Sequence, residues 1–124
     1  MSDRVLIVDD NAQNLKLARI LLESEGYEVS TAPDAEHAVE AIAAFEPTIV
    51  LMDIQLPGMD GLELTRRLKR DPTTKHIAVV VVTAYAMKGD EEKARAAGCD
   101  GYVTKPIDAD ALLTLLGRLG SRQG

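Results

Sequence analysis

Apolar runs in this sequence lead into side chains that could take part in phosphoryl chemistry. Asp9 and Asp10 follow a run near the N-terminus, and Asp53 follows a run in the middle of the chain. Thr83 ends a run of β-branched residues, and Lys105 follows a short run near the C-terminus. Considered singly, the acids could cap a helix or a turn, Thr83 could bond to the backbone and Lys105 could be a solvated charge. Considered together, they suit phosphoryl transfer, because a carboxylate can attack phosphorus to form an aspartyl phosphate.

The length and composition predict one globular domain with a full hydrophobic core. The chain has 124 residues, of which 46% are apolar and 27% are charged, and these values argue against disorder. We expect the domain to cover residues 1–119 and residues 120–124 to form a flexible tail. The single cysteine, Cys99, excludes an intramolecular disulfide and a cysteine-rich metal site.

The charge balance excludes several classes of protein. Asp and Glu number 20 against 14 Lys and Arg, a net charge of -6, so the chain has too few cations for sequence-independent binding to nucleic acid. No apolar stretch approaches the ~20 residues that a membrane-spanning helix needs. Residues 1–4 do not begin a secretory signal. We therefore expect a cytoplasmic protein without direct contact to nucleic acid or membrane.

Five apolar runs alternate with five segments of helical periodicity. Strands are expected at residues 4–8, 27–31, 48–52, 77–82 and 101–104. Helices are expected at residues 12–25, between Asp34 and Pro47, at residues 62–70 and 88–97, and from Asp108 to Leu119, with Asp34 and Asp108 as N-caps. The residues expected to be buried in the second helix are Ala38, Val39, Ile42 and Phe45.

Alternating strands and helices predict an α/β fold with a parallel sheet and helices on both of its faces. Residues 4–8, 48–52 and 77–82 are apolar enough for central strands. Residues 27–31 alternate and residues 101–104 are few, as expected of edge strands. The order 2-1-3-4-5 satisfies both conditions and is the flavodoxin-like (βα)5 arrangement. In this arrangement all five candidate residues lie at the carboxyl ends of the strands, on one rim of the sheet.

Three carboxylates on one rim repel one another, and Lys105 supplies only one compensating charge. A hard divalent cation would supply the rest, and carboxylates with a backbone carbonyl and water suit Mg²⁺. The backbone carbonyl of Gln55, in the loop just after Asp53, is a candidate ligand. Thr83 and Lys105 could then contact the oxygens of a phosphoryl group held beside the metal. The sequence thus predicts a Mg²⁺-dependent phosphoryl site.

Together with the stretch 51–61 (LMDIQLPGMDG), this set of residues resembles the receiver domain of two-component response regulators, over essentially the whole chain. The resemblance implies a CheY-like fold in which Asp53 is the phosphoacceptor and Asp9 and Asp10 form the acidic pocket. It also implies that Asp10 is the more direct Mg²⁺ ligand. Thr83 and Lys105 would be the residues that respond to the phosphoryl group. The implied phosphoryl donor is a histidine kinase or a histidine phosphotransfer protein.

The resemblance also indicates where the signal would leave the domain. Tyr102 occupies the aromatic switch position, although it could equally be an edge-strand tyrosine with its hydroxyl in water. Ala84 is small, as access to the aspartate requires, and Tyr85 flanks the phosphoryl site. The signal would reach a downstream protein through the fourth helix, the fifth strand and the fifth helix. Residues 84–91, which include Met87, are similar to single-domain cell-cycle receivers of the DivK type.

Other functions remain possible at this point. A Mg²⁺-dependent aspartyl phosphatase of the haloacid-dehalogenase type also forms an aspartyl phosphate, but it needs an acid two residues after the nucleophile, where this chain has Gln55. A flavodoxin-like FMN carrier needs a Gly-, Ser- or Thr-rich phosphate loop where this chain has Asp9 and Asp10. An adaptor that never accepts phosphate is a third alternative. We expect a phosphoacceptor switch rather than an enzyme with a separate substrate.

Overall fold

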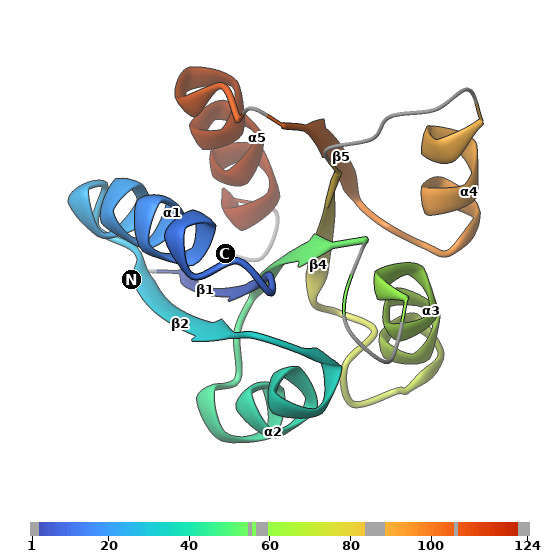
Figure 1. The fold of residues 1–124 in the computed structure, drawn as a ribbon. Helices are drawn as coiled ribbons and strands as arrows, with labels where there is room; N and C mark the ends of the chain where they lie inside the picture. Colours follow the sequence, from blue (N-terminus) through green and yellow to red (C-terminus); the bar gives the residue numbers. More distant parts are fainter. Residues whose placement is uncertain (1–2, 55, 57–59, 84–88, 106, 122–124) are drawn as a thin grey trace.

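The computed structural model describes residues 3–54, 56, 60–83, 89–105 and 107–121. Within these residues, five strands alternate with five helices (Figure 1). The strands are β1 (Arg4–Val8), β2 (Glu28–Ala32), β3 (Ile49–Asp53), β4 (Ala78–Thr83) and β5 (Gly101–Thr104). The helices are α1 (Ala12–Ser24), α2 (Ala35–Phe45), α3 (Gly61–Arg70), α4 (Asp90–Ala96) and α5 (Ala109–Ser121).

The strands form one parallel sheet in the order β2-β1-β3-β4-β5, which confirms the predicted fold class. Helices α1 and α5 cover one face, and α2, α3 and α4 cover the other (Figure 1). The three central strands are β1, β3 and β4, the most apolar runs, and the alternating and short runs form the edges, β2 and β5. The sequence pattern identified the edges because an edge strand is less buried than a central one.

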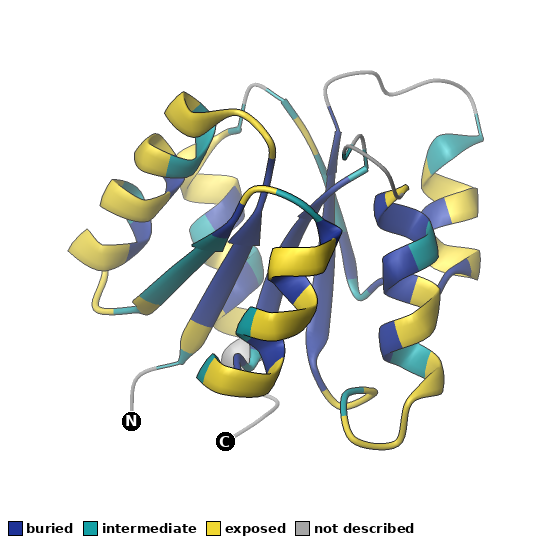
Figure 2. Cartoon of the chain, turned by 60° about the horizontal axis from the view of Figure 1, so that its bottom comes forward, coloured by how far each residue is buried: buried dark blue, intermediate teal, exposed yellow. Residues whose placement is uncertain are grey.

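Alternate residues of the central strands supply two separate cores. Ile7 and Leu51 pack with the inner faces of α1 and α5, and Val8 and Met52 pack with those of α2 and α3. The strands are buried throughout this region, whereas the outer faces of the helices are exposed (Figure 2). Helices cover both faces of the sheet, so its polar residues can contact solvent or a ligand only at the ends of the strands.

Several predicted boundaries shift by one residue toward the C-terminus. As a result, Asp53 and Thr83 are the last residues of β3 and β4 and do not begin the following loops. Helix α4 runs from Asp90 to Ala96 and is shorter than the predicted range 88–97, whose first residue lies outside the described part of the chain. Helix α5 ends at Ser121, inside the segment 120–124 that was expected to be a tail. The division of the chain at residue 119 stays a prediction.

The burial predicted for α2 is wrong at Val39. This side chain is 55% exposed, because Ala35, Ala38 and Ile42 form the face of α2 that packs on the sheet. A helix turns by about 100° per residue, so the position after Ala38 points away from that face. Phe45, the last residue of α2, is only partly buried. No helix of the described residues is long and apolar enough to cross a membrane.

Asp34 caps α2, as predicted. Its Oδ1 accepts hydrogen bonds from the backbone N–H of His37 at 2.8 Å, and the same carboxylate lies 2.8 Å from Nδ1 of the His37 ring. These two hydrogen bonds, the backbone one first, lower the pKa of Asp34. In return, the hydrogen bond and the negative charge of Asp34 raise the pKa of His37 above its ordinary value of 6.5. The cap therefore favours the charged form of the imidazole.

We predict that the Nδ1 and Cε1 resonances of His37, followed by NMR, titrate above pH 6.5. Protonated His37 is the form that Asp34 stabilises, so its contribution to stability is fully present below pH 6.5 and is lost as the pH rises through the raised pKa. Asp34→Asn should lower the His37 pKa, because it removes the negative partner. An unchanged titration in this variant would contradict the cap geometry.

Candidate functional site

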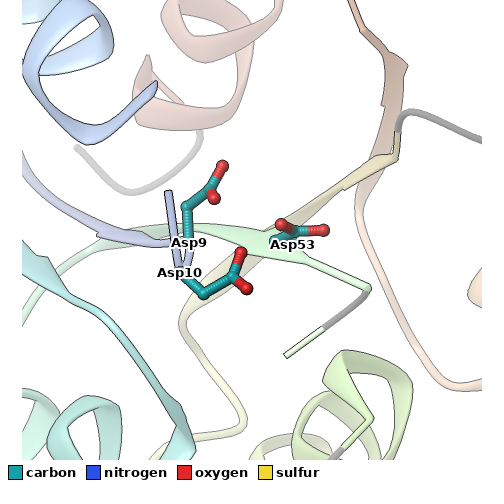
Figure 3. A group of neighbouring side chains, drawn as sticks. All are labelled: Asp9, Asp10 and Asp53. Carbon is teal, nitrogen blue, oxygen red and sulfur yellow. The ribbon is translucent and has the colours of Figure 1, made fainter. Parts of the chain in front are cut away.

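The ends of β1 and β3 bring the three candidate carboxylates together. Val8 pairs with Met52 in the parallel register, so the residues that follow, Asp9 and Asp53, lie side by side at the carboxyl ends of the two strands. Carboxylate oxygens of Asp9, Asp10 and Asp53 all lie within 4.8 Å of one another (Figure 3). Asp9 and Asp53 are each 6% exposed, whereas Asp10 is exposed. The predicted acidic cluster is thus present, with one member open to solvent.

Asp9 is held by hydrogen bonds from the start of α1. Its Oδ1 accepts from the backbone N–H of Asn11 at 2.9 Å, and its Oδ2 accepts from the Asn14 side chain at 3.4 Å. Asn11 itself caps α1, because its side-chain oxygen accepts from the backbone N–H groups of Gln13 and Asn14. The simpler role of helix cap therefore belongs to Asn11, and neither Asp9 nor Asp10 is needed for it.

Lys105 links the two buried carboxylates. Its Nζ lies 2.9 Å from Oδ2 of Asp9 and 3.5 Å from Oδ2 of Asp53. Burial lowers the pKa of this ammonium group, but the hydrogen bond that it donates to Asp9 and the negative charges of Asp53 and Asp9 outweigh burial, so the pKa is raised above 10.5. Lys105 is accordingly a fixed positive charge at neutral pH. It could equally contact a negative group added to Asp53.

Thr83 lies beside this lysine. The backbone N–H of Lys105 donates to the carbonyl of Thr83 at 2.8 Å, immediately past the pairing of Thr83 with Thr104. Thr83 is 2% exposed and ends β4, the strand whose Val82 pairs with Asp53. The structure therefore brings together Asp9, Asp10, Asp53, Thr83 and Lys105 at one rim of the sheet.

The charges at this rim do not balance within the described residues. Three carboxylates face the single ammonium group of Lys105, and Asp10 and Asp53 lie close enough to share a cation. Mg²⁺ takes oxygen ligands at 2.0–2.1 Å, so opposite ligands lie about 4.2 Å apart, close to the 4.8 Å limit of this cluster. The donor set thus fits Mg²⁺. Asp10 and Asp53 are the candidate ligands, because Lys105 lies closer to Asp9 than to Asp53.

The start of α3 lies against the end of β3. The backbone N–H of Gly61 donates to the carbonyl of Ile54 at 2.8 Å, and Asp60 caps α3 through the backbone N–H of Leu62. A Cβ atom at Gly61 would overlap the backbone oxygen of Asp53. In the sequence, Gly61 looks only like a turn residue. Its position directly after the N-cap Asp60 is the signal that could have revealed this role.

Four residues predicted at or near the site lie outside the described residues. They are Gln55, Ala84, Tyr85 and Met87. The contribution of Asn14 to the position of Asp9 was not predicted, and nothing in the sequence distinguishes this asparagine from other polar residues of α1.

Tyr102 lies on β5 with its side chain against the cluster that includes Leu62, Ala94 and Ala97. Its hydroxyl oxygen is buried and has no hydrogen-bond partner within the described part of the chain. Burial raises the pKa of Tyr102, as do the negative charges of Asp90 and Glu91 to a smaller extent. The alternative of a hydroxyl in water is therefore wrong, and the ring points inward.

The chain is similar to known proteins over nearly its whole length. Residues 5–117 match the family model of the response regulator receiver domain. The chain is 48% identical over 107 residues to the polar-differentiation response regulator DivK of Brucella ovis, which covers 86% of this chain and 87% of that protein. The CheY-like receiver domain protein of Methanospirillum hungatei superposes with a TM-score of 0.88 at 31% identity, over 99% of this chain and 98% of that one. The chemotaxis protein CheY4 of Vibrio cholerae superposes with a TM-score of 0.89 at 25% identity, over 96% of this chain and 99% of that one.

We predict that Gly61→Ala lowers the free energy of unfolding by about 2 kcal/mol or more, because backbone atoms cannot yield to the added methyl group as a side chain would. A matched control is Gly117→Ala in α5, where an added Cβ meets nothing within 4 Å. That change should raise stability by about 0.5–1 kcal/mol, since alanine is the better helix former. Urea unfolding curves measure both. Equal effects of the two substitutions would contradict the close approach at Asp53.

Proposed function

The chain belongs to the response regulator receiver domains, and we propose that it is a phosphorylation-dependent switch in which Asp53 accepts a phosphoryl group from a phosphohistidine. The observation that carries this proposal is the position of Lys105, which lies between Asp9 and Asp53 with the exposed Asp10 close by. A buried carboxylate at a strand end, with a cation beside it and two acids behind it, is suited to act as a nucleophile toward phosphorus.

The transfer consists of a simple exchange of bonds. A carboxylate oxygen of Asp53 forms a bond to phosphorus while the bond from phosphorus to the histidine nitrogen breaks. The imidazole leaves with the bonding electron pair, and the product is an acyl phosphate. A Mg²⁺ ion held by Asp10, Asp53 and the backbone carbonyl of Gln55 would neutralise charge on the phosphoryl oxygens. Lys105 would contribute its ammonium group, because Nζ already lies 3.5 Å from Asp53.

Thr83 and Lys105 would also respond to the phosphoryl group on Asp53. A phosphoryl group adds about 1.5 to 2 negative charges to a rim that already holds three carboxylates. Lys105 would be drawn from Asp9 toward the new charge, and Thr83 would donate its hydroxyl to a phosphoryl oxygen. Because Lys105 N–H is bonded to the Thr83 carbonyl, the two residues would move together.

We place the output on α4, β5 and α5, with Tyr102 as the reporting side chain. Helix α4 has seven residues, and Ala94 is its one buried side chain among the described residues. Few buried contacts imply low local stability, which suits an element that changes position. The downstream partner would be a protein that contacts this face.

The partners follow from the same chemistry. The phosphoryl donor would be a histidine kinase or a histidine phosphotransfer protein, and the site of action would be the cytoplasm. The relative from Brucella ovis is named a polar-differentiation response regulator, and the two chains cover each other to similar extents. We propose a role of that general class for this chain. It would support its own phosphorylation and dephosphorylation and would have no separate substrate.

We predict that the protein gains about 80 Da, one phosphoryl group, when it is incubated with acetyl phosphate and Mg²⁺. Intact-mass spectrometry would detect the adduct, which should be stable in acid and labile in base. Asp53→Asn should show no adduct, since an amide is a poor nucleophile. An adduct that persists in Asp53→Asn would exclude this residue as the acceptor. Rapid turnover of many phosphoesters would favour an aspartyl phosphatase instead.

We also predict that millimolar Mg²⁺ raises the melting temperature, because a ligand that binds only the folded state stabilises it. Asp10→Asn should melt higher than the wild type without Mg²⁺, since it relieves repulsion among the carboxylates, and it should lose most of the Mg²⁺-induced shift. Differential scanning calorimetry with and without Mg²⁺ makes both comparisons. A Mg²⁺ shift of the same size in Asp10→Asn would contradict the proposed ligand set.

A further inference from the structure

Asn14 lies beside the phosphoryl site, but the proposed function gives its side chain no part. It is in the first turn of α1 and is partly buried. Its side-chain nitrogen lies 3.4 Å from Oδ2 of Asp9, the same oxygen that accepts from Lys105 at 2.9 Å. A carboxylate only accepts hydrogen bonds, so the amide nitrogen is the end of the Asn14 side chain that suits this contact. One oxygen of a buried acid thus has two donors, one neutral and one charged.

The cap of α1 does not require the Asn14 side chain. The backbone N–H of Asn14 donates to the side-chain oxygen of Asn11, the N-cap residue, at 3.1 Å. The amide of Asn14 therefore has no task in starting the helix. The hydrogen bond that this side chain makes is the one to Asp9, which belongs to the acidic cluster.

Asp9 does not require Asn14 either, as long as Lys105 stays in place. Oδ1 of Asp9 accepts the backbone N–H of Asn11 at 2.9 Å, and Oδ2 accepts Lys105 at 2.9 Å. These are ordinary distances for such hydrogen bonds, whereas the 3.4 Å contact with Asn14 is long. Each oxygen of this carboxylate therefore has a donor closer than Asn14. The Asn14 amide would become important only if Lys105 moved away.

The proposed function requires this movement of Lys105. A phosphoryl group on Asp53 would attract the ammonium group, whose Nζ lies 3.5 Å from Oδ2 of Asp53 before any charge is added. Oδ2 of Asp9 would then lose its closest donor. Asp9 is only 6% exposed, and a buried acceptor without a donor is unfavourable. The loss would oppose the phosphorylated state unless another donor replaced Lys105.

We propose that Asn14 is a positioning residue that takes over Oδ2 of Asp9 when Lys105 moves to the phosphoryl group. This role rests on the proposed function. The amide is neutral, so the phosphoryl charge would not attract Asn14 as it attracts Lys105. The contact would shorten from 3.4 Å to about 2.9 Å, the usual length of such a hydrogen bond. With Asn11 on Oδ1 and Asn14 on Oδ2, the start of α1 would hold Asp9 in place.

The surroundings of Asn14 favour it as the replacement donor. Asn14, Asp9, Asp53 and Lys105 line one cavity of about 310 Å³, and the other side chains of its lining are apolar. Among these lining residues, Asn14 and Lys105 are the two whose side chains can donate a hydrogen bond. Water is the competing donor, but a water molecule would have to be immobilised, whereas the Asn14 amide is already in place.

The test compares how the whole chain binds beryllofluoride, an analogue of the phosphoryl group, and how it binds Mg²⁺ alone. Titrations followed in ¹H–¹⁵N spectra give both dissociation constants. Asn14→Leu removes the donor and keeps a side chain of similar size. We expect it to weaken the binding of beryllofluoride in saturating Mg²⁺ by about tenfold, a difference of about 1.4 kcal/mol. The affinity for Mg²⁺ alone should be nearly unchanged, because Lys105 still donates to Asp9 in that state.

The same spectra contain a direct signature of the exchange. The side-chain NH₂ group of Asn14 gives its own pair of ¹H–¹⁵N signals, which Asn14→Leu identifies by their loss. We expect one of these proton signals to move downfield when beryllofluoride binds to the wild type, because its hydrogen bond to Asp9 shortens. An asparagine that only supports the fold of α1 would not respond in this way.

Two variants provide matched controls. Gln13→Leu makes the same change from amide to leucine at the preceding, exposed position and should bind beryllofluoride as the wild type does. Asn14→Gln keeps the amide and should recover most of the affinity that Asn14→Leu loses. Urea unfolding without ligands should give Asn14→Leu a free energy of unfolding no lower than that of the wild type, since Lys105 holds Asp9 in the resting state.

Equal affinity of Asn14→Leu and the wild type for beryllofluoride overturns this role, as does an equal loss in Gln13→Leu. It is also overturned if the Asn14 amide signals do not move downfield, or if Asn14→Gln binds as weakly as Asn14→Leu. A loss of Mg²⁺ affinity as large as the loss for beryllofluoride would show a structural role instead. The proposed function fails by a separate result, an acetyl phosphate adduct that persists in Asp53→Asn.

Discussion

Repulsion among three carboxylates at one rim of the sheet is the constraint to which the surrounding structure responds. The parallel register fixes Asp9 and Asp53 side by side, and the fold cannot separate them without breaking the pairing of β1 with β3. The cost is reduced by Lys105, which bonds to Asp9 and approaches Asp53, and by the backbone N–H of Asn11, which bonds to Asp9. A cluster of carboxylates that is only partly neutralised is one that could hold a cation. A change of charge at Asp53 would alter the electrostatic repulsion among these carboxylates.

The opposite end of the sheet is held differently. Lys69 of α3 donates to the carbonyl of Ile77 at 2.6 Å and to the carboxylate of Asp100 at 2.7 Å. The same carboxylate oxygen accepts the backbone N–H of Val79 at 2.9 Å, so α3, β4 and the segment before β5 are joined at one point. Charges here are paired and bonded to the backbone, which favours a fixed geometry. At the carboxyl ends of the strands, by contrast, the ion pairs of Lys105 involve Asp9 and Asp53 of the acidic cluster itself, so a change of charge at Asp53 would act directly on them.

The sequence was sufficient for the fold because burial and sheet position are coupled. Unbroken apolar runs at residues 49–52 and 78–82 belong to strands that are dry on both faces, and this order determines which strand ends meet. The side-chain placements that were missed depend on details with no such pattern. Val39 is apolar yet faces solvent, because helical periodicity places Ala35, Ala38 and Ile42 on the sheet. Gly61 looks like any turn glycine until its close approach to the Asp53 carbonyl is known. The buried hydroxyl of Tyr102 depends on how α4 covers β5, a contact between elements that composition does not encode.

Tyr102 connects the acidic rim to the surface in physical terms. A buried hydroxyl without a partner costs about 1–3 kcal/mol relative to one that is hydrogen-bonded. Within the described residues the Tyr102 hydroxyl has no such partner, so packing against Leu62, Ala94 and Ala97 holds its inward position. Tyr102 pairs with Val81, two residues before Thr83, and the Thr83 carbonyl accepts from Lys105. A shift of Thr83 and Lys105 toward a new charge on Asp53 would change the packing around the Tyr102 side chain.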